Sequence, residues 1–171
     1  MPDPPATVEV YQLHVYLLEI SPAIWRRLRV RSDTTSADLH SILQIACDWT
    51  DSHLHRVVIY GKDYGIAQVG GIGFVDNPHQ VRLGDLRRRI NSRFRYEYDF
   101  GDLWPHQIRL ERTLPLADAR RYPSGTGGAR AAPPEDCGGP WALLALKQHY
   151  TPGWLAHQLL VILMKFDNQN Q

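Results

Sequence analysis

The residues best suited to acid–base or metal chemistry gather in one stretch of the sequence, Tyr96–Glu111. Aromatic and charged residues alternate on both sides of a Gly-Asp pair in this stretch, and that pattern predicts a β-hairpin. Asp99 and Asp102 fall in the turn region, and His106 follows on the second strand. Carboxylates and imidazoles transfer protons and hold metal ions. The candidate catalytic residues are therefore Asp99, Asp102 and His106.

Two more histidines extend this set. His53 and His55 share one face of a strand that we expect over residues 53–60. If that strand pairs beside the hairpin, the candidate ligands of a divalent metal ion are His53, His55, His106 and Asp99. Such a site predicts a metal-dependent hydrolase or nuclease. The alternative is structural, because histidines on sheet faces and aspartates that cap turn amides are common in ordinary folds.

The two cysteines are too few for a disulfide framework. Cys47 lies in an apolar helical pattern and is expected to be a core thiol. Cys137 lies between Asp136 and Gly138, with no cation beside it in the sequence to lower the pKa of its thiol. Nucleophilic catalysis by Cys137 therefore has little support.

Arginine dominates the basic residues: 16 of the 19 cations are Arg. Arginine suits two-point contacts with phosphate, although GC-rich coding also favours it. A strand expected over residues 24–31 places Trp25 on one face with three arginines, where a ring can stack on a base beside phosphate contacts. A second basic segment spans Arg82–Arg95. The candidate nucleic-acid-binding residues are Trp25, Arg27, Arg29, Arg31, Arg87, Arg88 and Arg89. The alternative is a solvated charged surface with arginine stems lying over Trp25.

The totals are those of an ordinary globular protein. A chain of 171 residues with 43% hydrophobic and 22% charged residues fits one folded domain. A net charge of +1 gives no argument for nucleic acid or membrane as a partner. The first residues lack the pattern of a signal peptide, and the longest apolar run is too short to cross a bilayer. We therefore expect a cytoplasmic protein with no membrane partner.

The elements that must position these residues belong to an α+β fold. We expect a single domain over residues 7–166 with flexible ends at 1–6 and 167–171, built on a mainly antiparallel sheet. A helix at about residues 36–48 should pack on one face, and an apolar helix should lie near the C-terminus. The expected strands cover residues 8–19, 24–31, 53–60, 94–100 and 104–112. Residues 62–80 and 113–140 are expected to be loops, with a short helix near 81–89.

Residues Pro133–Asp136 stiffen the second long loop, and their carboxylates are expected to bind backbone amides or Arg130. The functional alternative is a rim over the central hairpin. The candidate residues of that cleft rim are Trp104, Arg130, Glu135, Asp136 and Cys137.

The segment Trp154–Phe166 is apolar nearly all round. One domain face buries a narrower stripe than this, so we expect the segment to be a buried packing element, in the core or in a homodimer interface.

Four pieces of the chain, in order, resemble the plasmid pRiA4b ORF-3-like family, which is also labelled the IS1096-element passenger TnpR-like family. The pieces are Pro22–Arg27; Leu39-His40 with Trp49 and His53–His55; Tyr96–His106; and Arg130–Pro140. The resemblance implies an α+β domain with a mainly antiparallel sheet, and it implies little about activity. The TnpR part of the family's second name suggests a resolvase, but we attribute that name to mobile-element context. No serine here lies in the arginine-rich setting that resolvase chemistry needs.

The chain departs from the family pattern at two places. Ser124 and Ala132 stand where family members often carry cysteines, so a cysteine-based zinc site is not expected: Cys137 alone is no ligand set. An apolar tail replaces the usual acidic one, and only Phe166-Asp167 matches it. The leading hypothesis is a mobile-element-associated binding module, with nucleic acid or a protein as its partner.

Overall fold

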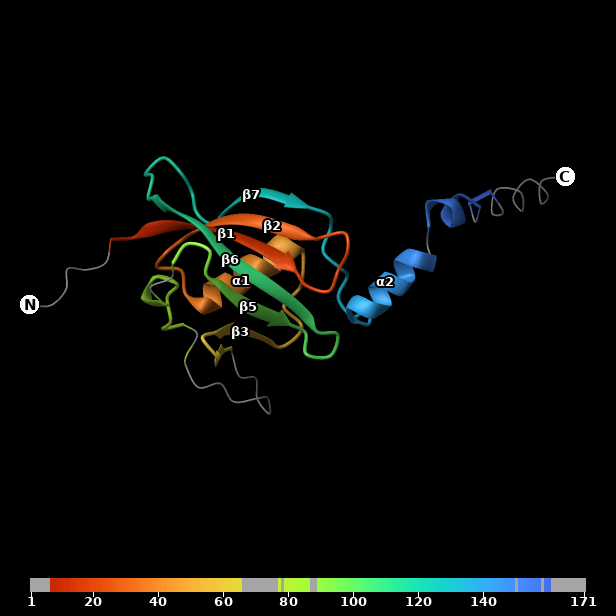
Figure 1. Ribbon diagram of the computed structural model, residues 1–171, viewed down its shortest axis with the longest axis horizontal. Helices are drawn as coiled ribbons and strands as arrows, with labels where there is room; N and C mark the ends of the chain where they lie inside the picture. The colour runs from red at the N-terminus through yellow and green to blue at the C-terminus, as the bar shows by residue number, and fades with distance from the viewer. Residues whose placement is uncertain are drawn as a thin grey trace, which may run out of the picture.

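The computed structural model describes residues 7–65, 77, 79–86, 89–149, 151–157 and 159–160. It is an α+β protein built on one antiparallel sheet, with strand order β4-β3-β5-β6-β1-β2-β7. Helix α1 lies against one face of this sheet, and α2 projects from one end (Figure 1). The elements are β1 Glu9–Leu17, β2 Trp25–Arg31, α1 Ser36–Cys47, β3 His55–Ile59, β4 Lys62–Tyr64, η1 Gly84–Leu86, β5 Arg93–Tyr98, β6 Trp104–Pro115, β7 Ser124–Ala129 and α2 Gly139–His149.

The five strands and the long helix predicted from the sequence are confirmed, with ends that shift by a few residues. Helix α1 begins at a capping box, in which the Thr35 side chain and the Asp38 side chain each accept from the other's backbone N–H. It ends at Asp48, which adopts the left-handed conformation at φ 59°.

Alternation decides which side chains enter the core. On β1, Leu13, Val15 and Leu17 are buried beneath α1, where they meet Leu39 and Leu43. The inner face of the central hairpin adds four large aromatic side chains, all nearly inaccessible to water: Phe94, Tyr96, Tyr98 and Trp104.

Two strands were missed because each lies in a stretch expected to be a loop. Strand β4 falls in residues 62–80, and the glycine-rich strand β7, Ser124–Ala129, falls in residues 113–140. Glycine disfavours strands in general, but here it permits close approach. A Cβ at position 127 would lie 3.3 Å from the Trp25 ring, and one at Gly128 would lie 3.1 Å from the Trp25 carbonyl oxygen. The expected helix near 81–89 is a single 3-10 turn, Gly84–Leu86.

The C-terminal part is helical from Gly139 to His149. The apolar segment that follows does not pack into the core where it is described. Leu155, Leu159 and Leu160 are 53%, 59% and 56% exposed, so the prediction of burial within the same chain is wrong for these three. Residues 161–166 and the ends 1–6 and 167–171 lie outside the described residues. None of the helices in the described part is long and apolar enough to cross a membrane.

Candidate functional sites

The sheet face opposite α1 is polar and lined with arginines. Gln12 on β1 pairs with Arg29 on β2, and His14 pairs with Arg27 on β2 and with Arg109 on β6. Paired residues in neighbouring strands project to the same side of a sheet. Three adjacent strands therefore contribute to a single surface, which we call the arginine face.

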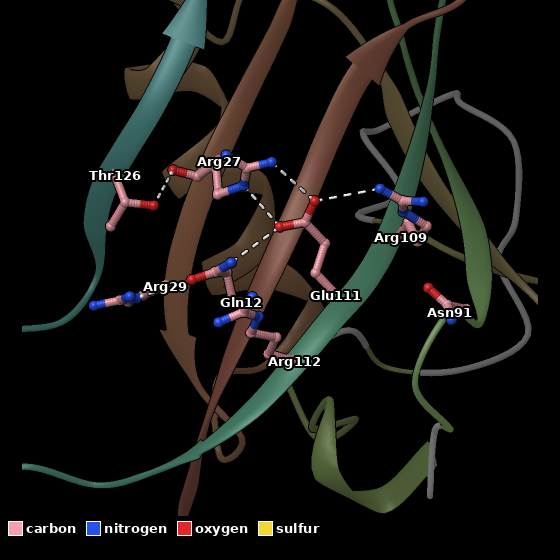
Figure 2. A pocket seen from close by; sticks show the side chains of 8 residues that line it. All are labelled: Gln12, Arg27, Arg29, Asn91, Arg109, Glu111, Arg112 and Thr126. Carbon is pink, nitrogen blue, oxygen red and sulfur yellow. Dashed lines mark hydrogen bonds and ion pairs between the residues drawn. The ribbon is translucent and has the colours of Figure 1, made fainter.

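The centre of the arginine face is a shallow open depression of about 550 Å³. Figure 2 shows its side chains on β1, β2, β6 and β7, and Asn91 in the turn before β5, with α1 behind the sheet. The depression is lined by Gln12, Arg27, Arg29, Asn91, Arg109, Glu111, Arg112 and Thr126.

Glu111 organises this depression. Arg27 binds it at two points, Nε to Oε2 at 2.7 Å and Nη2 to Oε1 at 3.0 Å. Arg109 Nη2 donates to Oε1 at 3.3 Å, and Gln12 Nε2 donates to Oε2 at 3.0 Å. The hydrogen bond from Arg27 is the main cause that lowers the pKa of Glu111 to about 2. The carboxylate is therefore ionised at neutral pH and fixes its neighbours.

A β-bulge places Glu111 at that point. Leu13 pairs with Leu110 and Gln12 pairs with Arg112, which leaves Glu111 as the additional residue of β6. Strict alternation would send residues 111 and 112 to opposite faces of the sheet. The bulge brings both side chains to the lining of the depression.

Positive charge remains after these pairs are formed. Four arginines and one glutamate line the depression, an excess of three positive charges on a chain whose net charge is +1. Arg29 Nε donates to the neutral Gln12 Oε1 at 3.2 Å. Within the described part of the chain, Arg29 and Arg112 form no ion pair. An anion at this surface would therefore meet uncompensated guanidinium groups.

The arrangement also carries an internal cost. Arg93 on β5 lies directly across from Arg109 on β6, and like charges in that relation disfavour the pairing of the two strands. Arg109 Nε is buried and has no hydrogen-bond partner in the described residues. Buried donors without a partner are uncommon, so this atom adds to the internal cost of the arrangement.

Trp25 lies at the β7 side of the arginine face. The Arg27 guanidinium lies 5.2 Å from the Trp25 ring centroid. The centroid of the His14 ring, on β1, also lies 5.2 Å from that of Trp25. Burial lowers the pKa of His14, so its imidazole is neutral at pH 7. The edge of the arginine face is thus aromatic.

The sequence-predicted nucleic-acid residues are divided by the structure. Trp25, Arg27 and Arg29 belong to the arginine face, but Arg31 is held by Asp33 in an ion pair of 2.7 Å. Arg89 is exposed in the turn before β5, and Arg87 and Arg88 lie outside the described residues.

Sequence reasoning missed several residues of the depression, including Gln12, Arg109, Glu111 and Arg112. The alternation on β6 did carry a signal, because Arg109 lies between the buried Ile108 and Leu110. What it could not give was the position of β1 between β2 and β6, which makes Arg27 and Arg109 neighbours of one carboxylate.

The predicted metal ligands do not converge on a single point. In the described residues, two groups of possible ligands occur, His40/Asp51/His55 and His53/Asp99/Asp136, and they contain three of the four predicted ligands. His53 and His55 separate because β3 begins at His55, so the alternation does not extend to His53. Neither His40 nor Asp51 was among the sequence candidates.

The first group is a hydrogen-bonded stack. His40 lies between Tyr96, with Nδ1 2.8 Å from the hydroxyl, and Asp51, with Nε2 2.7 Å from Oδ1. The His40 and His55 rings are parallel within 3°, with centroids 3.4 Å apart. An ion cannot lie in both ring planes of such a stack, so its geometry does not suit a shared metal. Burial, and then His40, lowers the pKa of His55 to about 4.

His106 belongs to neither group, so among the described residues the geometry gives no support for His106 as a ligand beside His53 or His55. It is buried, its Nδ1 lies 2.9 Å from the Trp104 carbonyl oxygen, and it packs edge-on against Trp49. Burial lowers its pKa to about 4. His106 is therefore a neutral core residue.

The turn aspartates fit the structural alternative. Asp99 Oδ1 accepts from the backbone N–H groups of Gly101 and Asp102, at 3.0 and 3.1 Å. Asp102 Oδ2 accepts from the N–H of Gly138 at 2.8 Å. Both aspartates therefore hold turn backbone, and Asp99 Oδ2 also lies 3.6 Å from His53 Nε2.

Most of the residues predicted for the cleft rim are buried or form hydrogen bonds that hold the loops in place. Trp104 is fully buried and lies in the core, not on a rim. Arg130 Nη1 donates to the Ala23 carbonyl oxygen at 2.8 Å. Glu135 accepts from the Thr50 backbone N–H at 3.1 Å and from the Tyr98 hydroxyl. Burial raises the pKa of the Cys137 thiol, which disfavours the thiolate.

Three comparisons place the chain among known proteins. Residues 9–152 match the model of a family described as plasmid pRiA4b ORF-3-like protein. The uncharacterized protein y4hQ of Sinorhizobium fredii (strain NBRC 101917 / NGR234) is 35% identical over 133 residues, covering 77% of this chain and 68% of that protein. The crystal structure of MM3350 from Methanosarcina mazei Go1, a protein of unknown function, has a TM-score of 0.74 at 32% identity. That match covers 91% of this chain and 90% of MM3350. The chain therefore belongs to the plasmid pRiA4b ORF-3-like family.

Proposed function

We propose that this protein is a binding module for single-stranded nucleic acid and that the arginine face is its binding surface. The observation that carries the proposal is the excess of three positive charges around the depression, on a sheet face that α1 leaves open. Phosphate neutralisation by arginine supplies most of the affinity in such complexes.

The shape of the surface favours unpaired strands over duplexes. A broad sheet face does not enter a DNA groove as a helix or a two-stranded ribbon does. Sheet surfaces that bind single strands combine cationic side chains with exposed aromatic rings, on which bases stack. Here Trp25 provides a partly exposed ring. Arg29 and Arg112, which form no ion pair within the described residues, are 83 positions apart in sequence but lie on one surface.

The test is titration of a fluorescent 20-nucleotide oligothymidine, followed by anisotropy at several salt concentrations. The double variant Arg29→Glu/Arg112→Glu should bind at least tenfold more weakly. Its plot of log affinity against log salt should be shallower by about 0.7 for each phosphate that the variant no longer neutralises. The matched control is Lys62→Glu/Lys147→Glu, which makes the same change of charge at exposed sites on β4 and α2.

The control should stay within about twofold of the wild-type affinity, because long-range charge effects are screened at ordinary salt. Absence of binding at low salt would refute the proposal. Equal losses in the two double variants would also refute it, because affinity would then follow net charge and not this surface.

A metal-dependent hydrolase or nuclease is the second candidate. Its support is confined to His53 and Asp99, which lie together, since His55 and His106 lie elsewhere. Hydrolysis of a nucleic-acid substrate that requires a divalent ion and is lost in His53→Gln would favour it over simple binding.

A further inference from the structure

His53, Asp99 and Asp136 come from three segments that are distant in the sequence and meet beyond one end of the sheet. His53 precedes β3, Asp99 lies in the turn between β5 and β6, and Asp136 lies in the loop between β7 and α2. His53 Nε2 is 3.6 Å from Asp99 Oδ2 and 3.1 Å from Asp136 Oδ1. One imidazole nitrogen is thus flanked by two carboxylates.

These contacts do not satisfy the histidine. The His53 Nε2 atom is buried, yet it has no hydrogen-bond partner in the described residues. The distance of 3.6 Å to Asp99 is too long for a hydrogen bond, and the contact with Asp136 lacks hydrogen-bond geometry. A buried polar atom of this kind normally has a partner, which can be an ion that the protein binds.

The distances suit a shared ion. Zinc binds imidazole nitrogen and carboxylate oxygen at about 2.0–2.2 Å, which sets neighbouring ligand atoms of a tetrahedral site roughly 3.3–3.6 Å apart. The separations of 3.6 and 3.1 Å between His53 Nε2 and the two carboxylates lie close to that spacing. The ligand atoms of the three residues all lie within 4.8 Å of one another.

The carboxylate of Asp99 is already positioned for this role. Its side chain is 6% exposed, and its Oδ1 is held by two backbone N–H groups of the turn, so that Oδ2 is directed at His53. Groups that orient a metal ligand from behind are a regular part of such sites. Asp136, in contrast, is 77% exposed and leaves the site open to water on one side.

We propose that His53, Asp99 and Asp136 bind one divalent transition-metal ion of the zinc type. Two carboxylates balance the charge of a divalent ion, and the imidazole favours zinc, cobalt or nickel over magnesium and calcium. Three protein ligands leave a further position for water, as in zinc sites that are not purely structural. The ion would link two segments of the chain, the loop that carries Asp136 and the turn at Asp99. The proposal does not depend on the function proposed for the arginine face.

The experiment is isothermal titration of the full, untagged chain with ZnCl2, with CoCl2 as a second probe whose visible absorption reports its coordination. One ion should bind per chain. Asp136→Asn should weaken binding at least tenfold and reduce the cobalt band, because it removes one ligand and leaves the exposed surface otherwise intact. His53→Gln should have the same effect.

The matched control is Asp51→Asn, an equally conservative change at a 63% exposed aspartate of the His40/His55 group. It should leave zinc affinity unchanged. The proposal is overturned if the wild-type chain binds neither ion, or if Asp51→Asn abolishes binding that Asp136→Asn preserves. Oligothymidine binding that persists in Asp136→Asn, even without metal binding, would show that the metal site and the arginine face act independently.

Discussion

Arg27 and Glu111 form a two-point ion pair between β2 and β6, and the strand that separates them, β1, contributes Gln12 to the same carboxylate. The pair joins residues 84 positions apart in the chain. It sets the position of the guanidinium groups on the arginine face, and it also removes one positive charge from that face.

The first prediction separates those two effects with Glu111→Gln. Loss of the charged acceptor should lower the free energy of unfolding by about 1.5–3 kcal/mol, as expected for hydrogen bonds to a charged group. The same change raises the local charge, so affinity for oligothymidine should increase. Urea unfolding and fluorescence anisotropy measure the two quantities. Asp118→Asn, at an exposed loop aspartate, is the control and should change neither. Weaker binding by Glu111→Gln would contradict the assigned role of the face.

The second prediction concerns stacking on Trp25. Replacement by alanine should weaken oligothymidine binding by about 1–3 kcal/mol, the usual contribution of one stacked base, and replacement by phenylalanine should restore part of it. The dependence of affinity on salt should stay the same, because the arginines that neutralise phosphate are unchanged. Anisotropy over a salt series checks this. Full affinity in both Trp25→Phe and Trp25→Ala would show that the ring does not stack on a base.

The third prediction is a dependence of stability on pH. The pKa values of His55 and His106 in the folded state are both about 4, lowered mainly by burial, whereas an unfolded histidine titrates near 6.5. The unfolded chain therefore binds more protons between these values, and stability falls as the pH drops from about 6.5 to about 4. Each histidine adds a slope of up to about 1.4 kcal/mol per pH unit.

Urea unfolding at pH 7.0, 6.0 and 5.0 measures this slope. In His106→Gln the slope should decrease by the share of one histidine, whatever the effect on stability at pH 7. His79→Gln, at an exposed histidine, should keep the wild-type slope. A wild-type stability that does not change over this range would mean that both histidines titrate normally.

The fourth prediction returns to the apolar C-terminal segment. Leu159 and Leu160 are more than half exposed, and a cluster of exposed leucines commonly marks an interface. We propose that the Trp154–Phe166 segment mediates a homodimer. Analytical ultracentrifugation should show a dimer for the wild type and a folded monomer for Leu159→Glu/Leu160→Glu. A wild-type chain that sediments as a monomer at all concentrations would end this proposal.

Much of the fold could be predicted because short-range sequence patterns indicate its strands and its long helix. The alternation in the central hairpin indicated which of its residues are buried, and α1 was predicted at about residues 36–48. Strand β7 could not be found in this way, because its glycines carry no alternation. Its pairing is explained by the close approach to Trp25, which is visible only once the two strands lie side by side.

The sites show the same division. Residue types alone indicated arginines that could bind phosphate and histidines with carboxylates that could bind metal. Only the tertiary structure decided that β1 lies between β2 and β6, so that Arg27 and Arg109 both contact Glu111. It also decided that His53 lies beside Asp99 and Asp136 and apart from His55. The physical reason is range. Local periodicity is determined by backbone geometry within a few residues, whereas strand order and loop contacts depend on the packing of the whole core.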